Sequence, residues 1–116
     1  MATRGDVEKF LAQFQIKMRV NGILYRYDRG KNQEALEELE IVPSYRRVII
    51  ENLSVENYVQ GAVIDELNSL GEMWVFGKDV RKREVYIKIM LGAEGCQTIC
   101  ISFHLAEHRL SYPFKR

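Results

Sequence analysis

The sequence predicts an α+β fold in which N-terminal helices pack on one face of a small antiparallel sheet. Apolar residues recur at helical spacing in the first half of the chain. In the second half, apolar and polar residues alternate from Glu84 to Leu91 and again from Thr98 to His104. Helices followed by strands favour α+β over a regular alternation of the two. With 116 residues, the chain has room for a single domain, 1–116.

Asp6 is expected to cap the first helix, which should end at Asn21-Gly22, where both residues tolerate positive φ. A short strand, Ile23 to Tyr27, should follow. The inward face of this helix is predicted to be Val7, Phe10, Leu11, Phe14 and Met18.

Three further helical segments are predicted before the sheet. Asn32 should cap the second helix, Pro43-Ser44 should open the third, and Ser54 should cap one or two more turns. The stretch from Gly61 to Glu72 has weak periodicity, so we expect a loop there, with one helical turn at Ile64–Leu67.

The second half is predicted to hold a strand fragment, Trp74 to Phe76, that ends at Gly77, and then a hairpin. The apolar sides of the two hairpin strands are expected to cover the core together, because side chains alternate along a strand. These core-facing residues are Val85, Ile87 and Ile89, with Ile99, Ile101 and Phe103. Their polar neighbours then share the opposite, open surface, which places Tyr86, Lys88, Ser102 and His104 together.

Charge is nearly balanced over the whole chain, which has a net charge of +1, but it is unevenly distributed. The segment from Lys78 to Lys88 carries a net charge of +3. Aromatic rings interleaved with bases are typical of single-stranded nucleic-acid binding, because rings stack on bases while cations hold phosphates. The candidate RNA-binding residues are Trp74, Lys78, Arg81, Lys82 and Arg83. The alternative is a solvated hairpin with scattered charges.

The same surface holds groups that can cut RNA through its own 2′-hydroxyl. That reaction needs a base for the hydroxyl, cations for the phosphorane and an acid for the leaving 5′-oxygen. The candidate catalytic residues are Tyr86, Lys88 and His104. His104 has the side-chain type whose unperturbed pKa suits proton transfer near neutral pH. The pattern leaves open which group takes the 2′-proton, and it is also compatible with purely structural roles.

No metal or cofactor is expected. Cys96, Cys100, His104 and His108 recur every four residues, but on a strand four residues span about 13 Å, too far for one zinc ion. A thiol nucleophile at Cys100 is disfavoured because no helix N-terminus is predicted beside it. Two cysteines, no secretory signal and no membrane-spanning apolar run make the cytoplasm the expected location.

Several segments resemble the MqsR family of toxins. The resemblance spans about residues 45 to 115 and includes Val48-Ile49-Ile50-Glu51-Asn52-Leu53-Ser54-Val55-Glu56-Asn57-Tyr58, Met73-Trp74-Val75-Phe76-Gly77-Lys78, Glu84-Val85-Tyr86-Ile87-Lys88-Ile89 and Cys100-Ile101-Ser102-Phe103-His104. It implies a RelE-like fold and an mRNA interferase that cuts single-stranded mRNA without a metal. It also implies a partner antitoxin with zinc-binding and helix-turn-helix domains, and it makes Tyr86 the active-site tyrosine.

The sequence departs from better-studied members of that family at three positions. Val59 and Val75 stand where those toxins have lysine and glutamine, and His104 stands where they have an active-site lysine. His104 keeps a proton-transfer group at its position, whereas the two valines remove polar groups. The expected function is therefore an endoribonuclease toxin, with a non-catalytic RNA- or partner-binding module and a purely structural interaction protein as alternatives.

Overall fold

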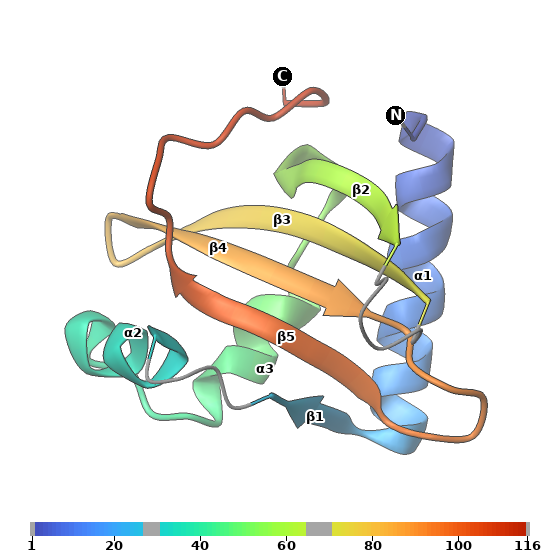
Figure 1. Ribbon diagram of the computed structural model, residues 1–116, viewed down its shortest axis with the longest axis horizontal. Coiled ribbons are helices and arrows are strands. Elements are labelled where there is room, and N and C mark those ends of the chain that lie inside the picture. The colour runs from blue at the N-terminus through green and yellow to red at the C-terminus, as the bar shows by residue number, and fades with distance from the viewer. Residues whose placement is uncertain (1, 27–30, 65–70, 116) are drawn as a thin grey trace.

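The computed structural model describes residues 2–26, 31–64 and 71–115 of the chain. Its helices and strands follow one another in the order α1 (Arg4–Asn21), β1 (Ile23–Tyr25), α2 (Lys31–Leu39), α3 (Tyr45–Glu51), the 3₁₀ turn η1 (Val55–Asn57), β2 (Tyr58–Ile64), β3 (Glu72–Val80), β4 (Arg83–Met90) and β5 (Thr98–Leu105). The strands form one sheet in the order β1-β5-β4-β3-β2 (Figure 1). All neighbours are antiparallel except β1, which is parallel to β5. The predicted α+β class is confirmed.

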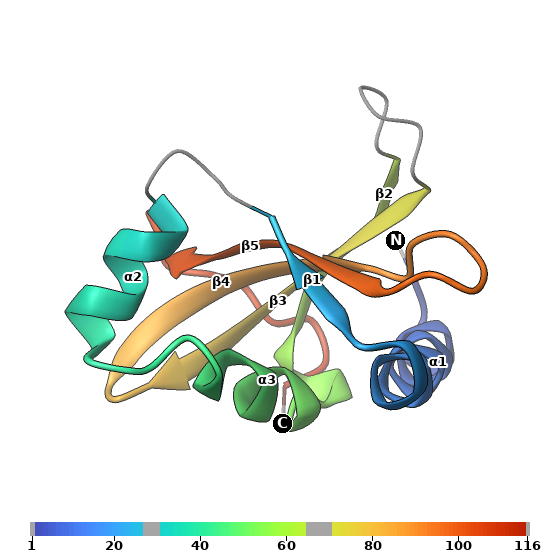
Figure 2. The same ribbon diagram turned by 90° about the horizontal axis from the view of Figure 1, so that it is seen from below.

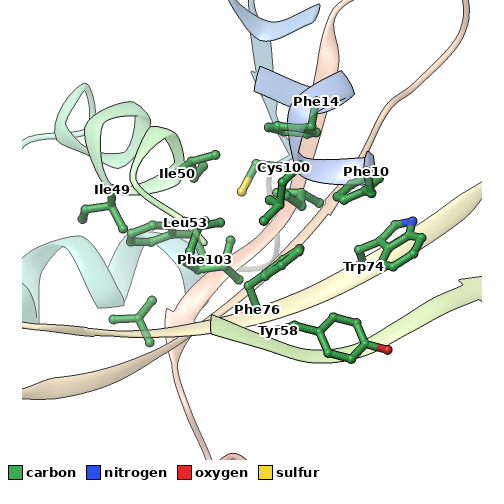
Figure 3. Packing of buried hydrophobic residues seen from close by; sticks show 14 of the residues in the cluster. Phe10, Phe14, Ile49, Ile50, Leu53, Tyr58, Trp74, Phe76, Cys100 and Phe103 are labelled. Carbon is green, nitrogen blue, oxygen red and sulfur yellow. The ribbon is translucent and has the colours of Figure 1, made fainter. Parts of the chain in front are cut away.

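The helices α1 and α3 lie on the same side of the sheet (Figure 2), and α2 packs mainly on β5. The opposite side carries no helix among the residues that the structure describes, and we call it the open face. The core lies between the helices and the sheet, where aromatic rings from α1, β2 and β3 meet (Figure 3). Phe10, Phe14, Tyr58, Phe76 and Phe103 are all at most 5% exposed there. The helices therefore leave one face of β3, β4 and β5 available for a site.

The N-cap of the first helix lies three residues earlier than predicted. Thr3 is the N-cap: its hydroxyl accepts a hydrogen bond from the Asp6 amide, while the Asp6 carboxylate accepts one from the Thr3 amide. Asp6 therefore completes a capping box instead of capping the helix itself. These hydrogen bonds lower the pKa of Asp6. The predicted end at Asn21-Gly22 is confirmed, with Gly22 at φ 85° and its amide bonded to the Met18 carbonyl.

The sequence predicts that Asn32 caps the second helix, and this prediction is wrong. Asn32 lies inside the first turn of α2 with its side chain buried. Its Oδ1 accepts a hydrogen bond from the Phe103 amide at 3.0 Å, and its Nδ2 donates to the Ile101 carbonyl at 3.4 Å. The short strand β1 pairs with β5 only as far as Cys100. The Asn32 amide thus continues the pairing where β1 has ended, because a side-chain amide offers the same donor and acceptor as a peptide.

The segment after Ser54 contains a strand that the sequence pattern does not predict. The predicted turn at Ser54 is confirmed as η1, but Tyr58 already starts β2, which runs to Ile64 where a loop was expected. Two register shifts interrupt its pairing with β3, and Gly61 has φ 137°, so the strand lacks a regular alternation. Ile64, the first residue of the helical turn predicted at Ile64–Leu67, is the last residue of β2. The other residues of that predicted turn lie outside the residues that the structure describes.

The strand β3 is also longer than predicted and runs through Gly77 to Val80. Arg81 and Lys82 alone connect it to β4, and both have positive φ, 51° and 68°. A two-residue turn with positive φ at both positions matches the right-handed twist of the flanking strands. The basic segment is therefore a tight hairpin turn.

A bulge in β5 overturns part of the predicted hairpin. Lys88 pairs with Ser102 but Ile89 pairs with Cys100, so Ile101 is an extra residue on β5. Cys100 therefore faces the core together with Ile89, and the prediction that Ile99 and Ile101 cover the core opposite Cys100 is wrong. Beyond the bulge the predicted alternation holds, with Phe103 in the core.

Candidate functional site

The open face brings together the four polar residues that the sequence placed there. Tyr86 pairs directly with His104 across β4 and β5, and Lys88 pairs with Ser102. The rings of Tyr86 and His104 stack, with centroids 5.0 Å apart and planes 12° from parallel. The Lys88 ammonium lies 5.9 Å from the centre of the Tyr86 ring. A phenol, an imidazole and an ammonium thus share one small region, half-exposed, while Ser102 beside them is buried.

The imidazole of His104 is held in one tautomer. Its Nδ1 lies 2.9 Å from the Leu105 carbonyl oxygen. Because a carbonyl oxygen only accepts, Nδ1 carries the proton of this hydrogen bond, and Nε2 is left as the basic nitrogen of the neutral ring. Partial burial raises the pKa of Tyr86, so its phenol stays protonated and acts as a donor near neutral pH.

Glu84 fixes the C-terminal segment (residues 106–115) beside this region. Its carboxylate accepts hydrogen bonds from the Leu110 amide at 2.9 Å and from the Tyr112 hydroxyl at 2.6 Å. Burial and this bond to Glu84 raise the pKa of Tyr112. Gly77, which pairs with Tyr86, lies beneath the segment, where a Cβ atom would meet the Tyr112 hydroxyl and Leu110. The segment therefore forms a wall next to Tyr86.

Trp74 is not on the open face, and its predicted position there is wrong. It alternates with Val75 along β3 and faces the helices, where it is 7% exposed. Its ring stacks on Phe10 of α1 with centroids 4.6 Å apart. In that position one face of the indole is covered by Phe10 and the ring lies on the helix side of the sheet, so it cannot stack on the bases of an RNA strand lying on the open face.

Lys78 also lies away from the open face. It lies two residues from Phe76 and from Val80 along β3, so it shares their helix side of the sheet. Its Nζ lies 3.5 Å from the Asn52 carbonyl oxygen beside α3. The prediction that Lys78 shares a surface with Tyr86 is therefore wrong.

The bases of the hairpin turn are exposed, and two of them have acidic neighbours. Arg83 pairs with Glu38 at 3.3 Å and Arg81 with Glu40 at 3.6 Å. All four side chains are at least half exposed, so each pair contributes little to stability. Lys82 makes no ion pair with any described residue. The turn therefore remains a candidate RNA contact at the end of the hairpin, with part of its charge compensated by Glu38 and Glu40.

The two cysteines differ in environment. Cys96 is exposed, whereas Cys100 is buried in the core, where desolvation raises its pKa to about 12. Cys100 therefore stays a protonated thiol at neutral pH. No three His, Cys, Asp or Glu side chains of residues 2–26, 31–64 and 71–115 are placed to hold a metal ion.

Two residues of this region, Glu84 and Tyr112, are not among the site residues that the sequence predicts. Alternation along β4 places Glu84 on the open face with Tyr86, so the side of the sheet on which Glu84 lies can be predicted from the sequence. The position of its partner Tyr112 cannot, because the two are 28 residues apart and belong to no repeating pattern.

Comparison of the chain with protein-family models, curated proteins and solved structures gives no match. The resemblance to the MqsR family is therefore carried only by the sequence segments given above. No helix of the described residues is long and apolar enough to cross a membrane.

Proposed function

We propose that this protein is an endoribonuclease that cleaves single-stranded mRNA without a metal ion, through attack by the 2′-hydroxyl. The observation that carries this proposal is the Tyr86–His104 stack with Lys88 beside it on the open face. The proposal extends to the toxin of a type II toxin–antitoxin pair, whose antitoxin carries zinc-binding and helix-turn-helix domains. That extension rests on the resemblance to the MqsR family alone.

Each of the three groups has a role in this reaction that its environment suits. Nε2 of His104 accepts the proton of the 2′-hydroxyl, whose oxygen attacks the adjacent phosphorus. The neutral phenol of Tyr86 donates a hydrogen bond to a phosphate oxygen and orients the linkage. The Lys88 ammonium stabilises the added negative charge of the phosphorane. The 5′-oxygen leaves with a proton from Lys88 or from water, and a 2′,3′-cyclic phosphate remains.

The test is incubation of purified protein with single-stranded RNA in the presence of a chelator. We expect cleavage that leaves cyclic phosphate ends. Loss of a proton-transfer group typically reduces the rate about 10²–10⁴-fold, which is the expected effect of His104→Ala. His108→Ala is the matched control, since His108 is the other histidine of the chain and is exposed. Intact RNA with the unmodified protein, or equal cleavage by His104→Ala, would refute the assignment.

A second candidate function is a non-catalytic RNA-binding module on the same surface. Val75 favours it, because it is apolar and 2% exposed on β3 next to Lys88, where MqsR toxins have glutamine. This alternative predicts RNA binding that weakens steeply with salt, since phosphate contacts compete with counterions, and RNA that stays intact afterwards.

A further inference from the structure

A second site is suggested by a groove of about 900 Å³ between the N-terminal half of α1 and the strands β2 and β3. The stacked rings of Phe10 and Trp74 line its inner side, and Lys9, Gln60 and Glu72 are among the polar residues around it. A volume of this size is typical of sites for small organic ligands. Because Trp74 faces the helices and Tyr86 faces the opposite side of the sheet, the groove is separate from the region of Tyr86 and His104.

The indole N–H of Trp74 is a hydrogen-bond donor without an acceptor in this groove. The side chain is 93% buried, yet its Nε1 makes no hydrogen bond with any described residue. Among the described residues that are not exposed, one side-chain polar atom, the Tyr25 hydroxyl, is both fully buried and without a hydrogen-bond partner. Trp74 Nε1 also has no partner, so it is not fully buried and keeps contact with solvent. Figure 3 shows this nitrogen on the edge of the ring that points away from the other labelled core residues. The donor is therefore available to a ligand.

A carboxylate accompanies this donor. Glu72 lies two residues before Trp74 on β3, so both side chains leave the same face of the strand, about 7 Å apart along it. Glu72 is exposed at the groove, and its carboxylate makes no ion pair or hydrogen bond with another described residue. Among the polar groups that line the groove, the Trp74 N–H donor and the Glu72 carboxylate therefore lie on the same face of β3, next to an aromatic wall.

We propose that this groove binds a guanine base. The Watson–Crick edge of guanine carries the O6 acceptor next to two parallel donors, N1–H and N2–H. O6 accepts from the Trp74 indole, and the two donors meet the Glu72 carboxylate, which can accept both at once. Uracil has one such donor and adenine has no pair of adjacent donors, so neither satisfies the carboxylate as well. Lys9 at the groove can meet a phosphate attached to the same nucleoside.

The base can belong to a free nucleotide or to single-stranded RNA, in which bases are splayed out and read on their Watson–Crick edges. In the second case the inference rests on the proposed function and adds a preference for guanine away from the cleaved linkage. The two cases share the same recognition chemistry, and they differ in whether neighbouring nucleotides add to the affinity.

The chain contains one tryptophan, so Trp74 reports on the groove without labelling. The single indole N–H signal in a ¹H–¹⁵N correlation spectrum should shift saturably when guanosine 5′-monophosphate or guanosine is added. The other nucleoside monophosphates should bind at least about fivefold more weakly. Glu72→Gln should weaken guanosine monophosphate about tenfold or more, because a bond to a charged acceptor is lost. Glu94→Gln, at an exposed residue outside the groove, is the matched control.

Several results would overturn the proposal. These are the absence of a saturable shift, an equal response to ribose 5-phosphate, equal binding of all four bases, or unchanged affinity in Glu72→Gln. A guanine-containing oligonucleotide that binds more tightly than the mononucleotide supports an RNA ligand, and equal affinity supports a free nucleotide. His104→Ala should keep this binding. Guanine binding without cleavage would therefore refute only the ribonuclease, and cleavage without a shift would refute only the groove.

Discussion

Asn32 is expected to contribute far more to stability than a polar residue in the first turn of a short helix normally does. Its side chain is 7% exposed and makes three hydrogen bonds, with the carbonyls of Arg26 and Ile101 and the amide of Phe103. In Asn32→Leu the buried Phe103 amide loses its acceptor, which costs about 1–3 kcal/mol. The two carbonyl contacts at 3.2 and 3.4 Å are longer and add about 1 kcal/mol together.

The expected loss is therefore about 2–4 kcal/mol, or about 8–16 °C in Tm for a domain of this size. Urea unfolding followed by circular dichroism gives the free energy of unfolding, and hydrogen exchange should show faster exchange at Phe103 than at its neighbours. Gln33→Leu, at the next and exposed residue of α2, is the control and should change the free energy by less than about 0.5 kcal/mol. Equal stability of the two variants would show that the Asn32 amide does not continue the pairing of β5 beyond the end of β1.

Three further predictions concern other parts of the molecule. In the native protein one thiol, Cys96, should react with a thiol reagent, and a second, Cys100, only after unfolding, because it is 1% exposed and its pKa is raised to about 12. Gly77→Ala should displace the C-terminal segment, since the added Cβ would lie 2.6 Å from Leu110 Cδ1, and limited proteolysis should then cleave that segment faster. Replacing Arg81 and Lys82 by Asn and Gly should raise the free energy of unfolding by about 1 kcal/mol, because both have positive φ, and should reduce any salt dependence of RNA binding.

The parts of the fold that the sequence predicted well are those where burial imposes a regular period. The inward residues of α1 and the alternation along β4 from Glu84 to Ile89 follow such a period, and both are confirmed, whereas Met90, predicted on the polar side, is buried. The strand β2 has no such period, because two register shifts and a positive φ at Gly61 break its alternation. A pattern-based prediction therefore takes it for a loop.

The error at Trp74 and Lys78 has a different origin. Both residues lie two positions from Phe76 and so share its side of the strand, and the sequence therefore contains the information about their side of the sheet. The predicted strand ended at Gly77, which assigned Lys78 to a loop and left Trp74 without a defined face. Gly77 instead pairs with Tyr86 inside the strand, and the C-terminal segment packs against it where a larger residue would place a Cβ atom. Contacts between distant segments of this kind are not readable from local spacing.

The bulge at Ile101 links the fold to the candidate site. Thr98, Cys100 and Ile99 fit either face of a strand, so the sequence alone does not show where the alternation changes. Cys100 lies in the core and His104 on the open face only because one extra residue separates the two halves of β5. Asn32 bonds the backbone on either side of Ser102, at Ile101 and Phe103, and so holds the strand just where the bulge reverses its faces.

Asn32 is therefore expected to position His104 as well as to stabilise the fold. Where Asn32→Leu is still fully folded, the imidazole signals of His104 should move downfield, because a ring stacked at 5.0 Å on Tyr86 is shielded by it. Tyr86→Leu gives the reference shift for an unstacked ring, and Gln33→Leu should leave the signals unchanged. If the ribonuclease proposal holds, RNA cleavage should fall with the loss of stacking under the same conditions. Unchanged His104 signals in a destabilised Asn32→Leu protein would show that the bulge keeps its geometry without the Asn32 amide.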